Sequence, residues 1–176
     1  MKSLLALAAL SVVTASLLSG CAATVALEPA ADAVNTVCAD MVVRLPDTVA
    51  DDLDLRETNA QGTGAWGTPD SVLLRCGVEP PAPTSELPCV LVGSVYWLRD
   101  GTNAPNYVFT TYGREPATEV IVDSDVAAPG VVLYDLESAV SQAESVSGCT
   151  EIEDSLGADP TATPTPTPTP TVKPTN

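Results

Sequence analysis

The sequence contains no histidine among its 176 residues. This absence excludes Ser-His-Asp and Cys-His catalytic arrangements, histidine metal ligands and an imidazole general base. Basic residues are few: seven lysines and arginines stand against 23 acidic residues, which gives a formal net charge of −16 at pH 7. An acidic excess of this size disfavours nucleic acid and anionic lipid head groups as partners, and its simplest effect is solubility.

No CxxC spacing occurs among the five cysteines, and together with the lack of histidine this gives no support to a metal site. We therefore expect neither a metal nor a cofactor. The cysteines must therefore have other roles, and the position of the first one indicates its role.

The first 20 residues have the pattern of a signal peptide. Lys2 supplies a positive charge, and residues 4–18 form a mainly apolar run. This run of 15 residues is shorter than the roughly 20 needed to cross a bilayer as a helix. The segment from Leu18 to Cys21 resembles the bacterial lipobox, in which the cysteine is acylated, for example with palmitate, and the signal peptide is removed just before it.

We therefore predict a lipoprotein that is anchored through Cys21 to the cell membrane on its extracytoplasmic face. Removal of residues 1–20, which contain Lys2 and no acidic residue, changes the formal charge from −16 to −17. The alternative is an ordinary secreted protein in which Cys21 happens to lie near the cleavage site.

Four cysteines remain once Cys21 carries lipid, an even number that predicts two disulfides in an oxidising compartment. Three pairings are possible. We expect Cys76 to pair with Cys89 across a short proline-rich loop, and Cys38 to pair with Cys149 so that the two ends of the domain are joined.

Composition divides the chain into four regions. We predict a signal peptide at 1–20, a lipidated N-terminal linker at 21–36, one folded domain at 37–156 and a disordered Thr-Pro-rich tail at 157–176. Prolines at every second position bias the tail to an extended polyproline II form. Such tails resemble O-glycosylated stalks, and a plain disordered tail is the alternative.

Within the domain, alternating apolar residues and β-branched runs predict an α+β fold with an antiparallel sheet of about four to five strands and two helices, stabilised by disulfides. The expected strands are 41–45, 71–76, 89–98, 106–112 and 117–123, with a hairpin turn at 113–116. A short helix capped by Asp47 and a long loop at 57–70 are also expected. The last helix follows Gly130 and buries its apolar face, Val132, Leu136, Ala139, Val140 and Ala143.

Three segments of this domain, AWGTPDSVLLRCGVEPP (65–81), VYWLRD (95–100) and TYGREPATEVIVD (111–123), resemble the DUF3515 family of actinobacterial lipoproteins. The likeness extends roughly from Cys38 to Cys149. It implies an envelope lipoprotein with one small domain and paired cysteines. The family is a domain of unknown function, so the resemblance supplies no catalytic residue.

Carboxylates are the remaining candidates for catalysis, and two sets lie close in sequence: Asp51, Asp52, Asp54 and Glu57, and Glu119 with Asp123. A glycan-cleaving enzyme uses a pair of such groups. Neither spacing is specific to a mechanism, and acids on one face of a strand are typical of a solvated sheet surface. We therefore predict no catalytic residue and no enzymatic activity, with a carboxylate-dependent cell-wall hydrolase as the alternative.

The Gly-rich loop at 57–70 is the candidate binding site. It carries Trp66 and is flanked by Arg56 and Arg75, so that an aromatic ring and guanidinium groups could together bind a sugar, a peptide carboxylate or an acidic partner. The alternative is that Trp66 packs against the sheet and that each arginine pairs with an acid. Trp97, in the most apolar strand, is expected in the core.

The predicted function is a binding or accessory module of the cell envelope. Its partners would be the membrane, through Cys21, and an unknown envelope protein or glycan. A structural spacer that presents the Thr-Pro tail is a further alternative.

Overall fold

The structure is a computed structural model that describes residues 23–84 and 86–152. The predicted signal peptide, Cys21 and the Thr-Pro tail lie outside the described residues. No helix within the described part of the chain is long and apolar enough to span a membrane.

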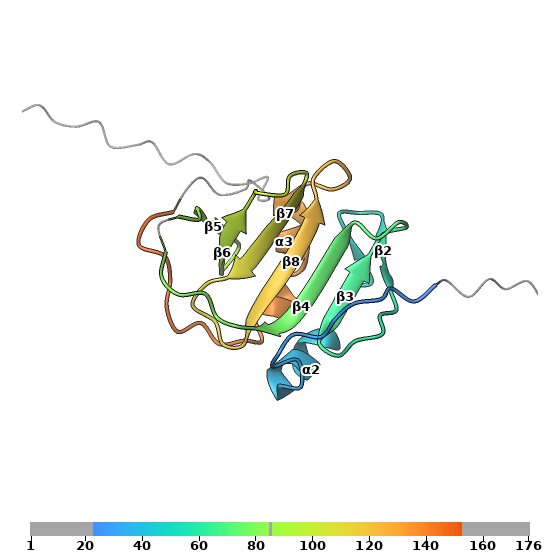
Figure 1. Cartoon of the computed structure of the whole chain (residues 1–176), viewed down its shortest axis with the longest axis horizontal. Coiled ribbons are helices and arrows are strands. Elements are labelled where there is room, and N and C mark those ends of the chain that lie inside the picture. Colours follow the sequence, from blue (N-terminus) through green and yellow to red (C-terminus); the bar gives the residue numbers. More distant parts are fainter. Residues whose placement is uncertain (1–22, 85, 153–176) are drawn as a thin grey trace, which may run out of the picture.

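One antiparallel sheet of eight strands forms the centre of the domain, in the order β1-β2-β3-β4-β8-β7-β6-β5 (Figure 1). The first four strands form one meander: β1 (Thr48–Val49), β2 (Leu53–Arg56), β3 (Thr63–Trp66) and β4 (Val72–Val78). The second meander contains β5 (Cys89–Val92), β6 (Val95–Asp100), β7 (Asn106–Thr111) and β8 (Ala117–Asp123). The two meanders meet where β4 pairs with β8.

The predicted α+β fold with four to five strands and two helices is therefore wrong: the described domain is mostly β, with eight strands in one sheet and three short helices. Part of the error is a hairpin that was read as one strand. Residues 89–98 turn back at Gly93 and Ser94, so that Val92 pairs with Val95. Gly93 has φ +56, which is a conformation that a two-residue hairpin turn requires and glycine adopts readily.

The expected loop at 57–70 is also corrected, because it contains β3. The side chains of this strand are small or fully enclosed, and all four residues are buried. A Cβ atom on Gly64 would lie 2.7 Å from Leu45 Cδ1 and 2.8 Å from the ring of Trp66. Glycine at this position therefore reflects close packing and not a flexible loop.

Three short helices cover one face of the sheet: α2 (Thr36–Val42), α3 (Pro129–Asp135) and α4 (Glu137–Val140). The Oδ1 atom of Asn35 caps α2 by accepting a hydrogen bond from the backbone N–H of Val37 at 3.0 Å. The predicted strand at 41–45 is wrong because its first residues end this helix. The predicted helix after Asp47 is replaced by the β1–β2 hairpin, in which Val49 pairs with Leu53.

The core lies between this sheet face and the helices. Trp66, Trp97, Phe109 and Met41 are its largest fully buried residues, so the placement of Trp97 in the core is confirmed. The apolar face predicted for the last helix is buried as expected, but it is shared between α3, α4 and the residues that follow them: Val132, Leu136, Ala139, Val140 and Ala143.

Residues 23–35, here called the N-terminal strap, lie against the domain. Val25 is buried, its N–H donates to Glu57 O at 2.9 Å and its carbonyl accepts from Asn59 N at 3.2 Å. The Arg56 guanidinium donates to Ala23 O at 2.6 Å. The strap therefore contacts, from the first described residue, the end of β2 at the side of the sheet that β1 and β2 form, here called the β2 edge.

The four cysteines form two disulfides as predicted, but the predicted pairing is wrong: Cys38 bonds Cys76, and Cys89 bonds Cys149. Cys76 is in β4, and strands β8, β7 and β6 separate β4 from β5, which contains Cys89. Four strand spacings amount to about 19 Å, whereas disulfide-bonded cysteines have Cα atoms less than about 7 Å apart. Nearness in sequence was therefore misleading, and only the strand order reveals the pairing.

Candidate functional site

The three residues predicted to form a binding loop do not come together. Trp66 is fully buried on the helix-covered side, and its Nε1–H donates to Pro46 O at 3.0 Å. Trp66 pairs with Val72 across β3 and β4, and Arg75 lies three residues further along β4. Because side chains alternate along a strand, Arg75 points to the opposite face of the sheet. Trp66 is thus part of the core and offers no aromatic surface to a ligand.

The two arginines hold parts of the domain together. Arg75 donates from Nε and Nη2 to Glu119 Oε1, at 3.0 Å and 2.6 Å. Arg56 donates to two backbone carbonyls, those of Gly67 at 3.0 Å and Ala23 at 2.6 Å. Arg75 therefore follows the alternative of pairing with an acid, and Arg56 instead binds the strap to the β2 edge.

The carboxylates considered for catalysis have structural partners or are dispersed. Glu119 forms an ion pair with Arg75. Asp123 accepts a hydrogen bond from Asp125 N at 3.0 Å. Asp51 and Asp52 form part of the β1–β2 turn. In the described part of the chain, no group of acidic or cysteine residues is arranged to hold a metal ion.

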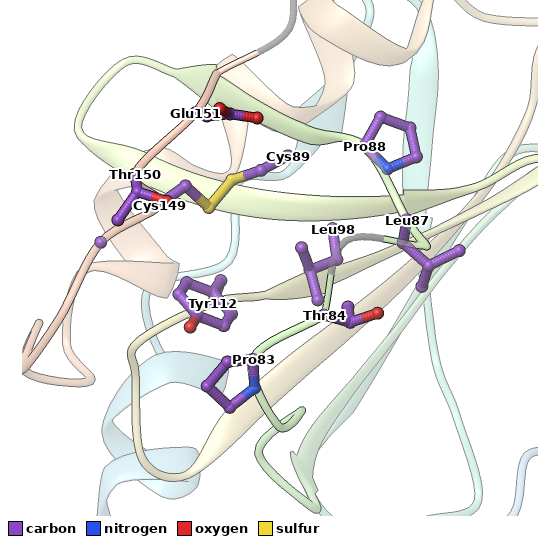
Figure 2. Close-up of a pocket in the computed structure, with 11 residues that line it drawn as sticks. Pro83, Thr84, Leu87, Pro88, Cys89, Leu98, Tyr112, Cys149, Thr150 and Glu151 are labelled. Atoms are coloured by element: carbon purple, nitrogen blue, oxygen red, sulfur yellow. A yellow bond between two sulfur atoms is a disulfide. The ribbon is translucent and has the colours of Figure 1, made fainter.

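A cavity of about 290 Å³ lies beside the Cys89–Cys149 disulfide and forms the candidate site (Figure 2). Its residues come from three parts of the chain that meet at the β5 edge. They are the β4–β5 loop (Pro83, Thr84, Leu87 and Pro88), the strands and their ends (Cys89, Leu98 and Tyr112) and the C-terminal segment (Gly148, Cys149, Thr150 and Glu151).

Strand alternation provides the apolar floor of this cavity. Trp97 faces the core, so its neighbour Leu98 faces the opposite side of β6, where only 3 % of its surface is exposed. Two backbone hydrogen bonds hold the residues beside Leu98 to β6: Tyr112 N donates to Tyr96 O at 2.8 Å, and Arg99 N donates to Pro88 O at 2.9 Å. The floor and the proline-containing wall are therefore fixed to the same strand.

The C-terminal segment forms the other wall and is held at two points. Cys149 is bonded to Cys89, and Val146 N donates to Gly113 O at 2.8 Å. A Cβ atom on Gly148 would lie 2.7 Å from the ring of Tyr96, so the backbone approaches β6 more closely there than a larger residue would permit.

Arg114 supports this wall from inside. It is buried, with its guanidinium donating to the carbonyl oxygens of Ala143 and Ser94. Burial lowers the pKa of Arg114, and the negative charge of Glu137 opposes that shift. Arg114 remains a cation at neutral pH, and its contacts join the β5–β6 turn to the start of the C-terminal segment.

The chemistry of the cavity suits binding. Proline, leucine and tyrosine side chains provide apolar surface, and Thr84, Thr150 and Tyr112 provide hydroxyl groups. Glu151 is the one charged residue among those that line it. A single carboxylate without a basic partner offers no acid–base pair for catalysis. The arrangement fits an uncharged ligand with apolar groups.

Two further cavities lie near the N-terminal strap. One of about 260 Å³ lies between the strap and the open sheet face, and Arg75 and Glu119 are among its lining residues. The other, of about 400 Å³, lies between α2 and the β2–β3 loop and is lined by uncharged residues that include Val34 and Val43. Arg75 thus lines a cavity, although without Trp66 or Arg56.

Sequence reasoning missed the cavity beside the disulfide. The sequence signal for it is the proline-rich stretch 80–88, which by itself predicts only a loop before Cys89. The strand order brings this stretch to Tyr112 and to the residues around Cys149. Without that order, the aromatic residue and the proline residues appear unrelated.

The fold and the cavity define a small antiparallel β-sheet domain with two disulfides and a cavity at one edge of its sheet. A family model described as "Protein of unknown function (DUF3515)" matches residues 3–147. The chain therefore belongs to the DUF3515 family, as its sequence segments predicted. No curated protein and no solved structure matches it.

Proposed function

We propose that the mature protein is a membrane-anchored extracytoplasmic lipoprotein that serves as a binding or accessory module of the cell envelope. Support for the anchor comes from the apolar run before Cys21 and from the two disulfides, which are typical of an oxidising compartment. The observation that carries the proposal further is the position of the strap.

The strap leaves almost no spacer between lipid and domain. Ala23, two residues after Cys21, already accepts a hydrogen bond from Arg56. Two residues extend over at most about 7 Å. A lipid on Cys21 would therefore hold the β2 edge of the sheet beside the membrane surface.

The candidate cavity would then face away from the membrane. Arg56, which binds the strap, lies in β2, and Cys89 lies in β5 at the other end of the sheet, six strands away (Figure 1). Six strand spacings correspond to about 29 Å. This edge is where an envelope protein or glycan would have access.

Replacement of Cys21 by Ala in the full chain tests the anchor. The native protein should incorporate a fatty-acid probe in cells and enter the detergent phase on partitioning, whereas Cys21→Ala should do neither. Val146→Ala, at an exposed site, is the matched control and should behave as native. Incorporation of the probe by Cys21→Ala would disprove the anchor.

A photo-reactive amino acid at position 150, which lines the cavity, tests the binding role in cells. We expect adducts with a defined envelope protein or glycan. The same group at position 134, which is exposed on α3, is the control. Equal adducts from both positions would mean that the cavity has no part in recognition, and the accessory role would have to be sought elsewhere.

A further inference from the structure

We infer that the cavity beside the Cys89–Cys149 disulfide binds the chain's own Thr-Pro segment, residues 160–171. This inference concerns what fills the cavity and does not depend on the lipid anchor. It rests on three observations, which are the lining of the cavity, the place where the described chain ends and the charge of the segment.

The lining has the composition of a site for proline-rich chains. Such chains dock in grooves lined by aromatic and apolar side chains, and they do so at low entropic cost because polyproline II is already extended. Tyr112 provides the aromatic ring, Leu98 the apolar floor, and Pro83 and Pro88 the flanking surface. The threonine hydroxyl groups of the cavity can pair with the backbone carbonyls of such a segment, which carry no internal hydrogen bonds.

The described chain ends at the cavity. Thr150 and Glu151 line it, and Ile152 is the last described residue. Pro160 follows eight residues later, and eight residues extend over up to about 27 Å. The segment can therefore return to the cavity in the same molecule.

Charge does not oppose this occupant, whereas it opposes an acidic peptide. Residues 160–171 contain no charged side chain, whereas the chain as a whole carries −16. The acidic domain does not repel an uncharged segment, whereas it repels acidic peptides. The four consecutive Thr-Pro units at 163–170 also offer several equivalent positions for one small cavity.

Tethering makes even a weak contact effective. A short flexible connection provides an effective concentration of about 1 mM. A segment with a dissociation constant of about 1 mM for the isolated contact would then occupy the cavity in about half of the molecules. Occupancy of this size is measurable by NMR as an average between free and bound signals.

The experiment uses the chain from residue 21 to 176 with Cys21→Ser, so that no lipid is present. The amide signals of Leu98, Tyr112 and Gly148 are compared with those of a variant in which Pro164, Pro166, Pro168 and Pro170 are all replaced by Ala. We expect these cavity signals to shift, while the amide signal of Tyr134 on α3 stays unchanged. Identical cavity signals in both chains would overturn the inference.

A second variant tests the other side of the contact. Tyr112→Ala should lower the heteronuclear NOE values of the tail threonines toward those of a free chain, and the matched variant Tyr134→Ala should leave them unchanged. Tail threonines that are equally mobile in all three proteins would refute docking. The tail variant does not alter the domain, so the first comparison remains decisive even if Tyr112→Ala does not fold.

Dilution identifies the molecule that provides the segment. Docking within one chain predicts cavity shifts that are independent of protein concentration over a tenfold range. Shifts that disappear on dilution would assign the segment to a second copy and overturn docking within one molecule. Because the chain tested carries no lipid, none of these results bears on the Cys21 experiment.

Discussion

The disulfide that closes the shorter loop should contribute more to stability than the disulfide that closes the longer loop. The paired cysteines are separated by 38 positions in the sequence for Cys38 and Cys76, and by 60 for Cys89 and Cys149. Loop entropy alone predicts a stabilisation of about 3.9 kcal/mol for the shorter loop and about 4.3 kcal/mol for the longer one. That estimate assumes that the native chain holds both cysteines in place without the bond.

The structure satisfies this assumption for one pair only. Cys38 lies in α2 and Cys76 in β4, and both are fully buried in the core. Residues 144–148, which lead to Cys149, are all exposed. Without the bond, this segment would gain mobility in the native state as well, which offsets part of the entropy gained by the unfolded chain. We therefore expect a loss of about 4 kcal/mol for the Cys38→Ala/Cys76→Ala protein, and about 1–2 kcal/mol for Cys89→Ala/Cys149→Ala.

Urea unfolding followed by tryptophan fluorescence measures both losses. Hydrogen exchange provides a check that is independent of the cavities left by the missing sulfur atoms. In the Cys89→Ala/Cys149→Ala protein, the amide of Val146 should exchange much faster while that of Val120 in β8 stays protected. Equal losses of stability in the two double variants, or loss of protection at Val120 together with Val146, would contradict this expectation.

Two further predictions concern single groups. Trp66→Phe should lower the free energy of unfolding in urea by about 1 kcal/mol more than Trp97→Phe. The reason is that Trp66 Nε1 donates to Pro46 O, whereas Trp97 Nε1 is buried without a partner among the described residues. Equal losses of unfolding free energy would contradict a role for the Trp66 hydrogen bond. The pKa of Asp100 is lowered, first by the Thr102 hydroxyl and then by the Thr102 N–H, so any stability it contributes is present above its unfolded pKa and lost as pH falls through the folded pKa. Thr102→Val should raise the pKa of Asp100 in an NMR titration, and an unchanged pKa would show that the hydroxyl has no effect.

Sequence patterns predicted the parts of the fold that local chemistry determines. The β7–β8 hairpin is confirmed, with Phe109 paired to Val120, because alternating apolar residues and a turn sequence specify it within a few residues. The family and the presence of disulfides were also predicted. Each of these conclusions depends on neighbours along the chain.

The errors arise where long-range packing overrides local pattern. Gly64 and Ala65 indicated a loop, yet both are buried in β3, where Leu45 and the ring of Trp66 pack against Gly64. The glycines around Trp66 predicted a ring accessible to a ligand, yet Trp66 is part of the core. The cavity depends on the connection from β4 to β5, which crosses the sheet and brings the proline-rich loop to Tyr112. No local sequence pattern predicts that connection.

The two-meander sheet also has a consequence for how the chain oxidises. Each disulfide lies within one half of the described chain. Cys38 pairs with the cysteine that follows it, Cys76, and Cys89 pairs with the cysteine that follows it, Cys149. When a chain emerges N-terminus first, the first meander can close its bond before the second pair has appeared. If Cys21, which precedes Cys38, already carries lipid, simple order of emergence selects the native pairs without reshuffling of mispaired cysteines.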